Sequence, residues 1–354
     1  MRDIICSGCS FTNLGGLQKE RIINGTTPST DVCFTNGSYP EAIMRNYGNK
    51  VYNSGLMSNS ISTSVLSLLS ISNRLLKEGN NNFSVILQST DLERQAVYVP
   101  DYYRKIKNIK SNITWPKNNN YLFGDDDSGF IQLGGLSFID DKFYSECKNI
   151  TKIAKSISEN VYTPEYSTIN SLTHVLLLQN FCKSNNIPYK IFFSSNLFCD
   201  SVFPFFDIDK TNEETYFKSY FVDKKLPIKK ELGSINSDPY VSDLFSMLDM
   251  DGVWFYKTDE TNYGGMYEWF FKNNEYKEGD LEYTPLYIED AARFNQSGER
   301  FGVWPIIPND SKHMLPITKA KTDMKEGKWW DTGHPTYYYW ERFVKEVMVD
   351  WNLF

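Results

Sequence analysis

The chain has 354 residues, of which 41% are hydrophobic and 23% are charged, and its formal net charge is −7. This length supports a substantial buried core, and the acidic balance leaves no basic field for phosphates, which disfavours a nucleic-acid partner. No apolar run is long enough for a transmembrane helix, so we expect no membrane insertion.

The first predicted element is a short strand over residues 2–7, which Gly8 and the residues after it break into a turn. This start contains only two consecutive aliphatic residues and does not resemble a signal peptide, so we expect a protein made and kept in a cytoplasm or released by lysis. The next predicted elements are a helix over 40–47, a strand over 51–53, a helix over 61–76 and a strand over 83–87. The last of these is a continuous apolar run, which is typical of a strand buried on both faces of a parallel sheet.

The α/β rhythm is interrupted three times by irregular sequence and then returns. The later predicted elements are a helix over 168–182, a strand over 189–194, a helix over 241–248, a strand over 253–256 and a closing amphipathic helix after residue 335. We therefore expect a three-layer α/β/α fold with a mainly parallel sheet, built as one discontinuous domain. Its core segments are residues 1–96, 163–194, 241–270 and 329–354, and its aromatic-rich insertions are residues 97–162, 195–240 and 271–328.

The candidate catalytic residues lie at the two ends of the chain. Ser10 follows the first strand, and a turn there lies at the carboxyl edge of an α/β sheet, where ligand crevices form. A serine hydroxyl becomes a nucleophile when a histidine accepts its proton and an acid orients that histidine. Of the three histidines, His174 lies in an apolar helical run and His313 in an irregular polar stretch. His334 follows Asp331 by three residues, which lets both side chains project from one turn.

Residues 8–12, Gly-Cys-Ser-Phe-Thr, resemble the first sequence block of the SGNH (GDSL-like) hydrolases, which is usually Gly-Asp-Ser-x-Ser. The form with cysteine is similar to members found in phages and marine microbes. Residues 331–335, Asp-Thr-Gly-His-Pro, resemble the last block of that family, Asp-x-x-His. The resemblance implies a flavodoxin-like SGNH-hydrolase fold, with Ser10 as nucleophile and Asp331 and His334 as its partners.

The two middle blocks of the family match less closely. The second block begins at Asn53, and strict spacing puts Ser58 where the family has its oxyanion-binding glycine, with Gly55 as a nearby alternative. The third block puts Thr90 where the family has an asparagine. The resemblance therefore implies an oxyanion hole formed by the amides of Ser10 and of Ser58 or Gly55, together with Thr90. Loss of one such donor costs about 10²–10³ in rate.

Two further residues are candidates for substrate binding. Arg94 resembles an arginine of the same subgroup, and its alternative is a solvated helix charge. Trp330 and the neighbouring aromatic residues 337–339 flank the histidine turn, where they form crevice walls or pack the closing helix. The aromatic share of the whole chain is 16%, which a Tyr- and Phe-rich core explains more simply than a surface that binds sugar or a partner protein.

The six cysteines are too sparse for a disulfide scaffold in a chain of this size. Cys6 and Cys9 fit a C-x-x-C pattern with a redox or zinc alternative, but no second such pair exists and histidines are few. Cys9 is expected to pack as a small buried residue, and a thiol nucleophile is its alternative. The acidic run 125–127 is either a solvated loop or a calcium site. We expect neither a metal ion nor a cofactor.

The expected function is a serine esterase that removes acyl groups from a carbohydrate or another small O-acyl ester. The alternative is a structural or adaptor protein of a phage virion, in the tail or neck, which uses the same fold as a scaffold with or without residual activity. In that case the partners are other virion proteins and the location is the virion.

Overall fold

The computed structural model describes the core segments of the chain and short parts of the sequence between them. The described residues are 1–9, 12, 38–55, 59–89, 92, 95–99, 129–133, 164–194, 198, 238–259, 262–266, 269, 273, 330–331, 334–335 and 337–354.

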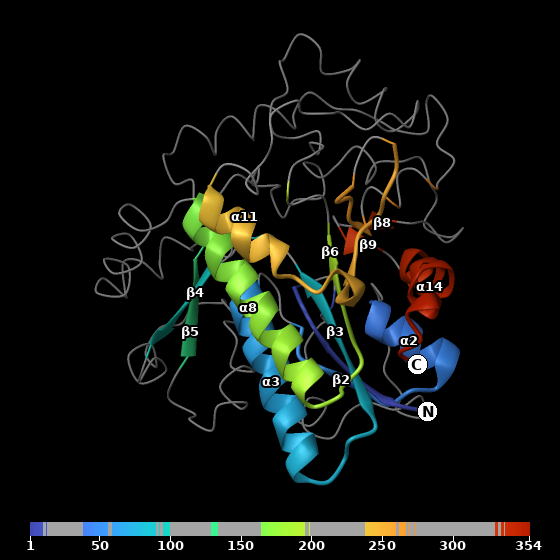
Figure 1. The fold of residues 1–354 in the computed structure, drawn as a ribbon. Helices are drawn as coiled ribbons and strands as arrows, with labels where there is room; N and C mark the ends of the chain where they lie inside the picture. The colour runs from blue at the N-terminus through green and yellow to red at the C-terminus, as the bar shows by residue number, and fades with distance from the viewer. Residues whose placement is uncertain are drawn as a thin grey trace, which may run out of the picture.

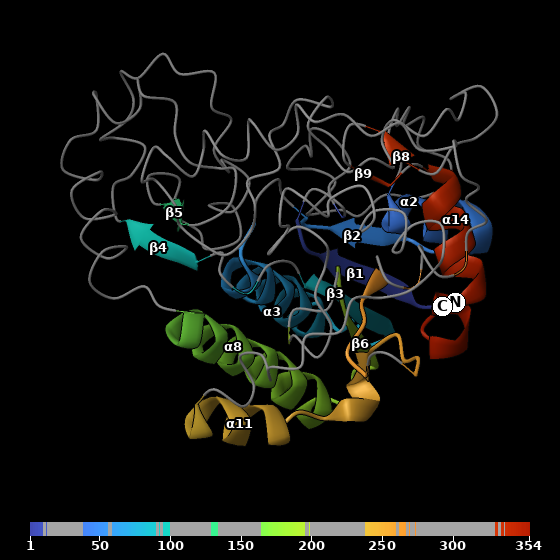
Figure 2. The same cartoon turned by 90° about the horizontal axis from the view of Figure 1, so that it is seen from above.

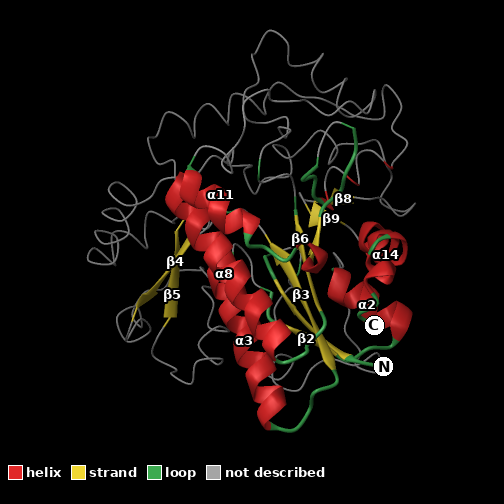
Figure 3. Ribbon diagram, viewed as in Figure 1, coloured by secondary structure: helices red, strands yellow, loops and turns green. Residues whose placement is uncertain are grey.

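A five-stranded sheet forms the centre of the molecule, and every neighbouring pair of its strands is parallel (Figures 1 and 3). Its strands are β1 (Asp3–Ser7), β2 (Val51–Asn53), β3 (Phe83–Ser89), β6 (Tyr189–Phe193) and β7 (Val253–Trp254). The spatial order is β2-β1-β3-β6-β7. All seven residues of β3 are buried, which confirms the strand predicted from the continuous apolar run.

The predicted helices are present, each within a few residues of its expected bounds. They are α2 (Tyr39–Tyr47), α3 (Ile61–Lys77), α8 (Pro164–Ser184), α11 (Pro239–Ser246) and α14 (Tyr337–Glu346), with 3-10 turns η2 (Met250–Gly252) and η6 (Met348–Trp351). Three of them begin at a side-chain cap, because Ser38, Ser60 and Asp238 accept hydrogen bonds from backbone amides of the first turn. None of the described helices is both long and apolar enough to span a lipid bilayer.

Helices cover both faces of the sheet (Figure 2). On one face lie α3 and α8, with α11 against α8, and their apolar side chains form a continuous cluster with alternate strand residues such as Ile5, Val85 and Leu87. On the other face lie α2 and α14, and the contacts there are largely aromatic. The ring of Phe192 lies 5.4 Å from Tyr39 and 5.6 Å from Phe343. The mainly parallel α/β architecture expected from the sequence is therefore present.

Two small antiparallel pairs lie outside the main sheet. Strands β4 (Gln95–Val99) and β5 (Gly129–Leu133) form an antiparallel ribbon. The ribbon pairs the start of the predicted insertion 97–162 with residues near its middle. This ribbon was not predicted, because no strand alternation is visible there. Strands β8 (Trp330–Asp331) and β9 (His334–Pro335) form a short hairpin directly before α14.

Candidate active site

The order of the sheet strands reverses between β1 and β3. From β1 the chain passes through α2 to β2 on one side, and then crosses through α3 to β3 on the other side. Ligands of open α/β sheets bind at such a switch point, beyond the carboxyl ends of the two strands. Here the switch point brings Gly8 and Cys9, which follow β1, beside Gln88 near the end of β3.

Gln88 is the centre of a buried set of polar contacts at this point. Its Oε1 accepts hydrogen bonds from the backbone amide of Cys9 at 3.3 Å, from the Cys9 thiol at 3.2 Å and from the Thr12 hydroxyl at 3.3 Å. Its Nε2 donates to the carbonyl of Ser89 at 2.9 Å. The backbone amide of Thr12 donates to the carbonyl of Cys9 at 2.9 Å, which closes the turn on itself.

Two asparagines from the β2 side hold the same turn. Asn53 Nδ2 donates to the carbonyl of Thr12 at 2.6 Å, and Asn59 Nδ2 approaches the carbonyl of Gly8 at 3.4 Å. We call Gly8, Cys9, Thr12, Asn53, Asn59 and Gln88 the turn network; the five of them other than Gly8 are at most 1% exposed. The segment after β1 therefore forms hydrogen bonds on both sides, with Gln88 of β3 and with the two asparagines on the β2 side.

Gly55 is already engaged in this arrangement. Its backbone amide donates to Asn53 Oδ1 at 2.9 Å, so in the structure it does not point to an external oxyanion. A Cβ at this position would lie 2.7 Å from the Cβ of Thr12, which is closer than real contacts allow. A Cβ on Gly8 would likewise lie 2.7 Å from the carbonyl oxygen of Gln88. Glycine at both positions lets the turn approach the strand ends closely.

Tyr39 connects the turn to the C-terminal helix. Its hydroxyl lies 3.5 Å from the carbonyl of Ser7 and forms a hydrogen bond with Thr12, and its ring lies 5.5 Å from that of Trp340. Burial raises the pKa of Tyr39 well above its ordinary value, so the phenol is neutral and serves as a donor. One fully buried side chain of α2 thus contacts both the first turn and α14.

The structure describes the backbone of the C-terminal candidates. Asp331 and His334 are direct partners in the β8–β9 ladder, with Trp330 opposite Pro335. Both views place this hairpin beside α14 (Figures 1 and 2). The side chains of Trp330, Asp331 and His334 lie outside the described part of the structure, as do Ser10, Ser58, Thr90, Arg94, His313 and the acidic run 125–127.

The cysteines of the C-x-x-C pattern are both free thiols. Cys6 is fully buried in β1, and burial is the main cause that raises the pKa of its thiol far above the ordinary value. A thiolate for redox or metal chemistry is therefore disfavoured at Cys6. Cys9 is 1% exposed, which confirms that it packs as a small buried residue. The described residues contain no group of three or more His, Cys, Asp or Glu arranged to hold a metal ion.

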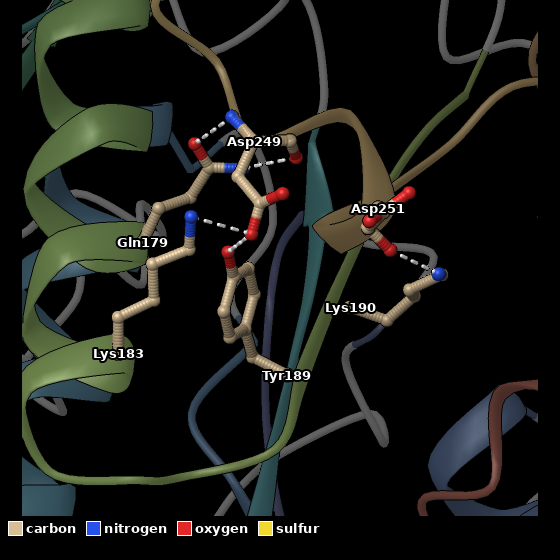
Figure 4. A network of polar contacts seen from close by, with 6 residues as sticks. All are labelled: Gln179, Lys183, Tyr189, Lys190, Asp249 and Asp251. Carbon is tan, nitrogen blue, oxygen red and sulfur yellow. Dashed lines mark hydrogen bonds and ion pairs between the residues drawn. The ribbon is translucent and has the colours of Figure 1, made fainter.

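A second polar network lies at the opposite, amino edge of the sheet (Figure 4). Gln179 of α8 donates to the carbonyl of Asp249 at 2.9 Å and accepts from its amide at 3.0 Å. The carboxylate of Asp249 accepts from the Tyr189 hydroxyl at 2.6 Å and pairs with Lys183 at 2.9 Å. These contacts join α8, β6 and the turn before β7, so they stabilise the fold.

His174 lies half-buried on α8, where its Nδ1 is 2.8 Å from the carbonyl of Asn170. This confirms that His174 lies in a helix, as its apolar helical run predicted. No role was predicted for Tyr39, Asn59 or Gln88. The available indication was that Asn53 and Gln88 are polar residues directly after apolar strand residues, at the edge where a site is expected.

Comparison of the chain with protein-family models, with curated proteins and with solved structures gives no match.

Proposed function

We propose that this protein is a serine esterase of the SGNH type, which cleaves O-acyl esters of carbohydrates or other small molecules through an acyl-Ser10 intermediate. The order of its sheet strands, taken along the chain, is 2-1-3-4-5, which is the order of flavodoxin-like folds and is consistent with that family. We also propose that the fold is the flavodoxin-like fold of the SGNH hydrolases.

The observation that carries the proposal is the contact of both chain ends with Tyr39. This residue contacts Ser7 and Thr12, which flank Ser10 in the sequence, and the ring of Trp340 in α14. Helix α14 begins two residues after the β8–β9 hairpin, in which Asp331 and His334 are ladder partners. Opposite positions of an antiparallel pair lie on one face of the ladder, which suits an acid that orients a histidine.

In the proposed reaction the Ser10 hydroxyl attacks the acyl carbon while His334 accepts its proton. His334 then transfers this proton to the leaving alcohol as the ester C–O bond breaks, and Asp331 stabilises the imidazolium. Water attacks the acyl-enzyme in the same way and releases the acid. The amides of Ser10 and Ser58 and the hydroxyl of Thr90 hold the oxyanion. The Gly55 amide is not assigned to it, because Asn53 already accepts its hydrogen bond.

The substrate class rests on the family resemblance and on the aromatic content of the chain. Arg94 follows the proposed third block, and Trp330 lies on β8 directly before Asp331. In the proposal Arg94 binds a polar group of the acylated molecule and Trp330 packs against a sugar ring.

Labelling with a fluorophosphonate tests the mechanism. We expect the probe to modify Ser10, and Ser10→Ala to abolish both labelling and hydrolysis of p-nitrophenyl acetate while the circular dichroism spectrum is unchanged. Ser246→Ala is the matched control, since Ser246 is an exposed serine on α11. Modification at Cys9, or no modification of the folded protein, would overturn the serine mechanism. The second result would favour the alternative of a virion scaffold protein.

A further inference from the structure

We infer that Gln88 is the positioning residue of the nucleophile turn and that Cys9 is its matched hydrogen-bond donor; this inference rests on the role proposed for Ser10. Cys9 and Thr12 stand on either side of Ser10 and Phe11 in the sequence. Both donate to the same atom, Gln88 Oε1, at 3.2–3.3 Å. A single carbonyl oxygen therefore fixes both ends of the segment that carries the nucleophile.

The orientation of the Gln88 amide is determined by its second contact. Nε2 donates to the carbonyl of Ser89 at 2.9 Å, so Oε1 must face the turn. A flipped amide would set an N–H₂ group against the donors of Cys9 and Thr12 and an oxygen against the carbonyl of Ser89. The side chain is 0% exposed, so water does not replace either contact.

The acceptor Gln88 Oε1 explains why residue 9 is a hydrogen-bond donor. The SGNH family, which the first block resembles, has an aspartate at this position. A carboxylate there would set oxygen against Gln88 Oε1 in a buried place, which is unfavourable. A thiol has a donor hydrogen, and Cys9 Sγ lies 3.2 Å from Gln88 Oε1. Cys9 and Gln88 are thus complementary, and the thiol acts as a donor to the turn instead of as a nucleophile.

Gln88→Met removes the acceptor while keeping a side chain of similar length. Misplacement of a reacting group by about 1 Å lowers a rate on the order of 100-fold. We therefore expect kcat for p-nitrophenyl acetate and the rate of fluorophosphonate labelling at Ser10 to fall about 10- to 100-fold, with a smaller change in KM. The matched control is Gln179→Met. Gln179 is also buried and bonded through both amide atoms, but it lies at the opposite edge of the sheet (Figure 4), so its variant should lower the Tm and leave kcat unchanged.

Gln88→Glu gives a readout that a purely structural role would not produce. A protonated carboxyl reproduces the amide, because its hydroxyl donates to Ser89 and its carbonyl oxygen accepts from Cys9 and Thr12. Burial raises the pKa of such a carboxyl. We expect kcat of this variant to fall on the alkaline side as the introduced carboxyl ionises, whereas kcat of the wild type stays constant over the same pH range.

The Cys9 variants test the pairing itself. Cys9→Ser keeps a donor and should retain kcat within about threefold, whereas Cys9→Ala should lose about tenfold. In the Gln88→Met background, Cys9→Ala should have no further effect, because the acceptor is already absent.

The outcomes separate this inference from the proposed function. Labelling of wild-type Ser10 together with equal labelling rates in Gln88→Met would overturn the positioning role and leave the esterase proposal intact. Additive effects of the Cys9 and Gln88 variants would overturn the matched pair. Absence of labelling in the wild type would overturn the esterase proposal first, before any variant is compared.

Discussion

Glu41 on α2 is a buried carboxylate with an incomplete set of partners. Its side chain is 2% exposed, its Oε1 pairs with Arg45 at 2.6 Å, and its Oε2 has no hydrogen-bond partner among the described residues. Burial raises the pKa of Glu41 to about 7, although the Arg45 guanidinium acts in the opposite direction. A carboxyl whose pKa is higher in the folded state favours folding while it is protonated, below its unfolded pKa of about 4.3. That contribution is lost as the pH rises through about 7.

Glu41→Gln should therefore flatten the pH dependence of stability. The amide cannot ionise, so we expect the variant to gain about 1–3 kcal/mol over the wild type near pH 8 and little near pH 5. Urea denaturation at both pH values measures this. The control is Glu78→Gln, since Glu78 lies at the same helical spacing from Arg74 but is 59% exposed. An identical pH slope in the wild type and in Glu41→Gln would contradict the assignment.

At the scale of elements, the amino-edge network joins α8, β6 and η2 (Figure 4). Partial burial acts to raise the pKa of Asp249, but hydrogen bonds from Tyr189 and Lys183 prevail and hold it below the usual range. Asp249 therefore stabilises the fold above its unfolded pKa, and this contribution is lost as the pH falls through the lower, folded value.

Gly252 lets the ring of Tyr189 lie close to the backbone of η2, since a Cβ on Gly252 would be 2.6 Å from the ring carbon that bears the hydroxyl.

Tyr189→Phe tests the contribution of this network. The substitution leaves the ring in place and removes the donor to Asp249, so we expect a loss of about 1–3 kcal/mol in the free energy of unfolding. The loss should shrink at acidic pH, where Asp249 is protonated. Tyr240→Phe is the control, because Tyr240 is 61% exposed. If both variants unfold at the same urea concentration as the wild type, the hydrogen bond does not contribute.

At the scale of the whole molecule, the C-terminal segment completes the core. The ring of Phe343 lies 5.1–6.3 Å from those of Trp254, Trp269 and Trp351, and the first two of these come from a distant part of the chain. Ser84 of β3 donates to the carbonyl of Leu353 at 3.0 Å. The last residues are therefore bonded to the sheet. Because α14 lies between these residues and the β8–β9 hairpin, this contact also restricts where the hairpin can lie.

Phe343→Ala should lower the free energy of unfolding by about 3–5 kcal/mol, because it leaves a cavity among rings that cannot all collapse. Val349→Ala is the control, since Val349 is 39% exposed and should change stability by less than about 0.5 kcal/mol. Thermal unfolding followed by tryptophan fluorescence measures both. A loss below 1 kcal/mol in Phe343→Ala would show that α14 is a peripheral addition to the fold.

The core elements and their order along the chain could be predicted from residue patterns alone. Apolar periodicity is a local property, so the helix over 61–76 and the strand over 83–87 appear in the structure as α3 and β3 with small changes at their ends. β3 extends to Ser89 because its last residues pair with Phe192 and Phe193 of β6, which the local pattern does not contain.

The residues that surround the candidate site could not be predicted in this way, because they come together only on folding. Gln88 meets Cys9 across 79 positions of sequence, and Tyr39 meets Trp340 from the other end of the chain. Such contacts depend on strand order and on parallel register, which no local pattern encodes. The motifs at Ser10 and His334 predict a chemistry from residue type and spacing. The buried acceptor of Cys9 and Thr12, Gln88 Oε1, comes into place only when β1 and β3 lie side by side.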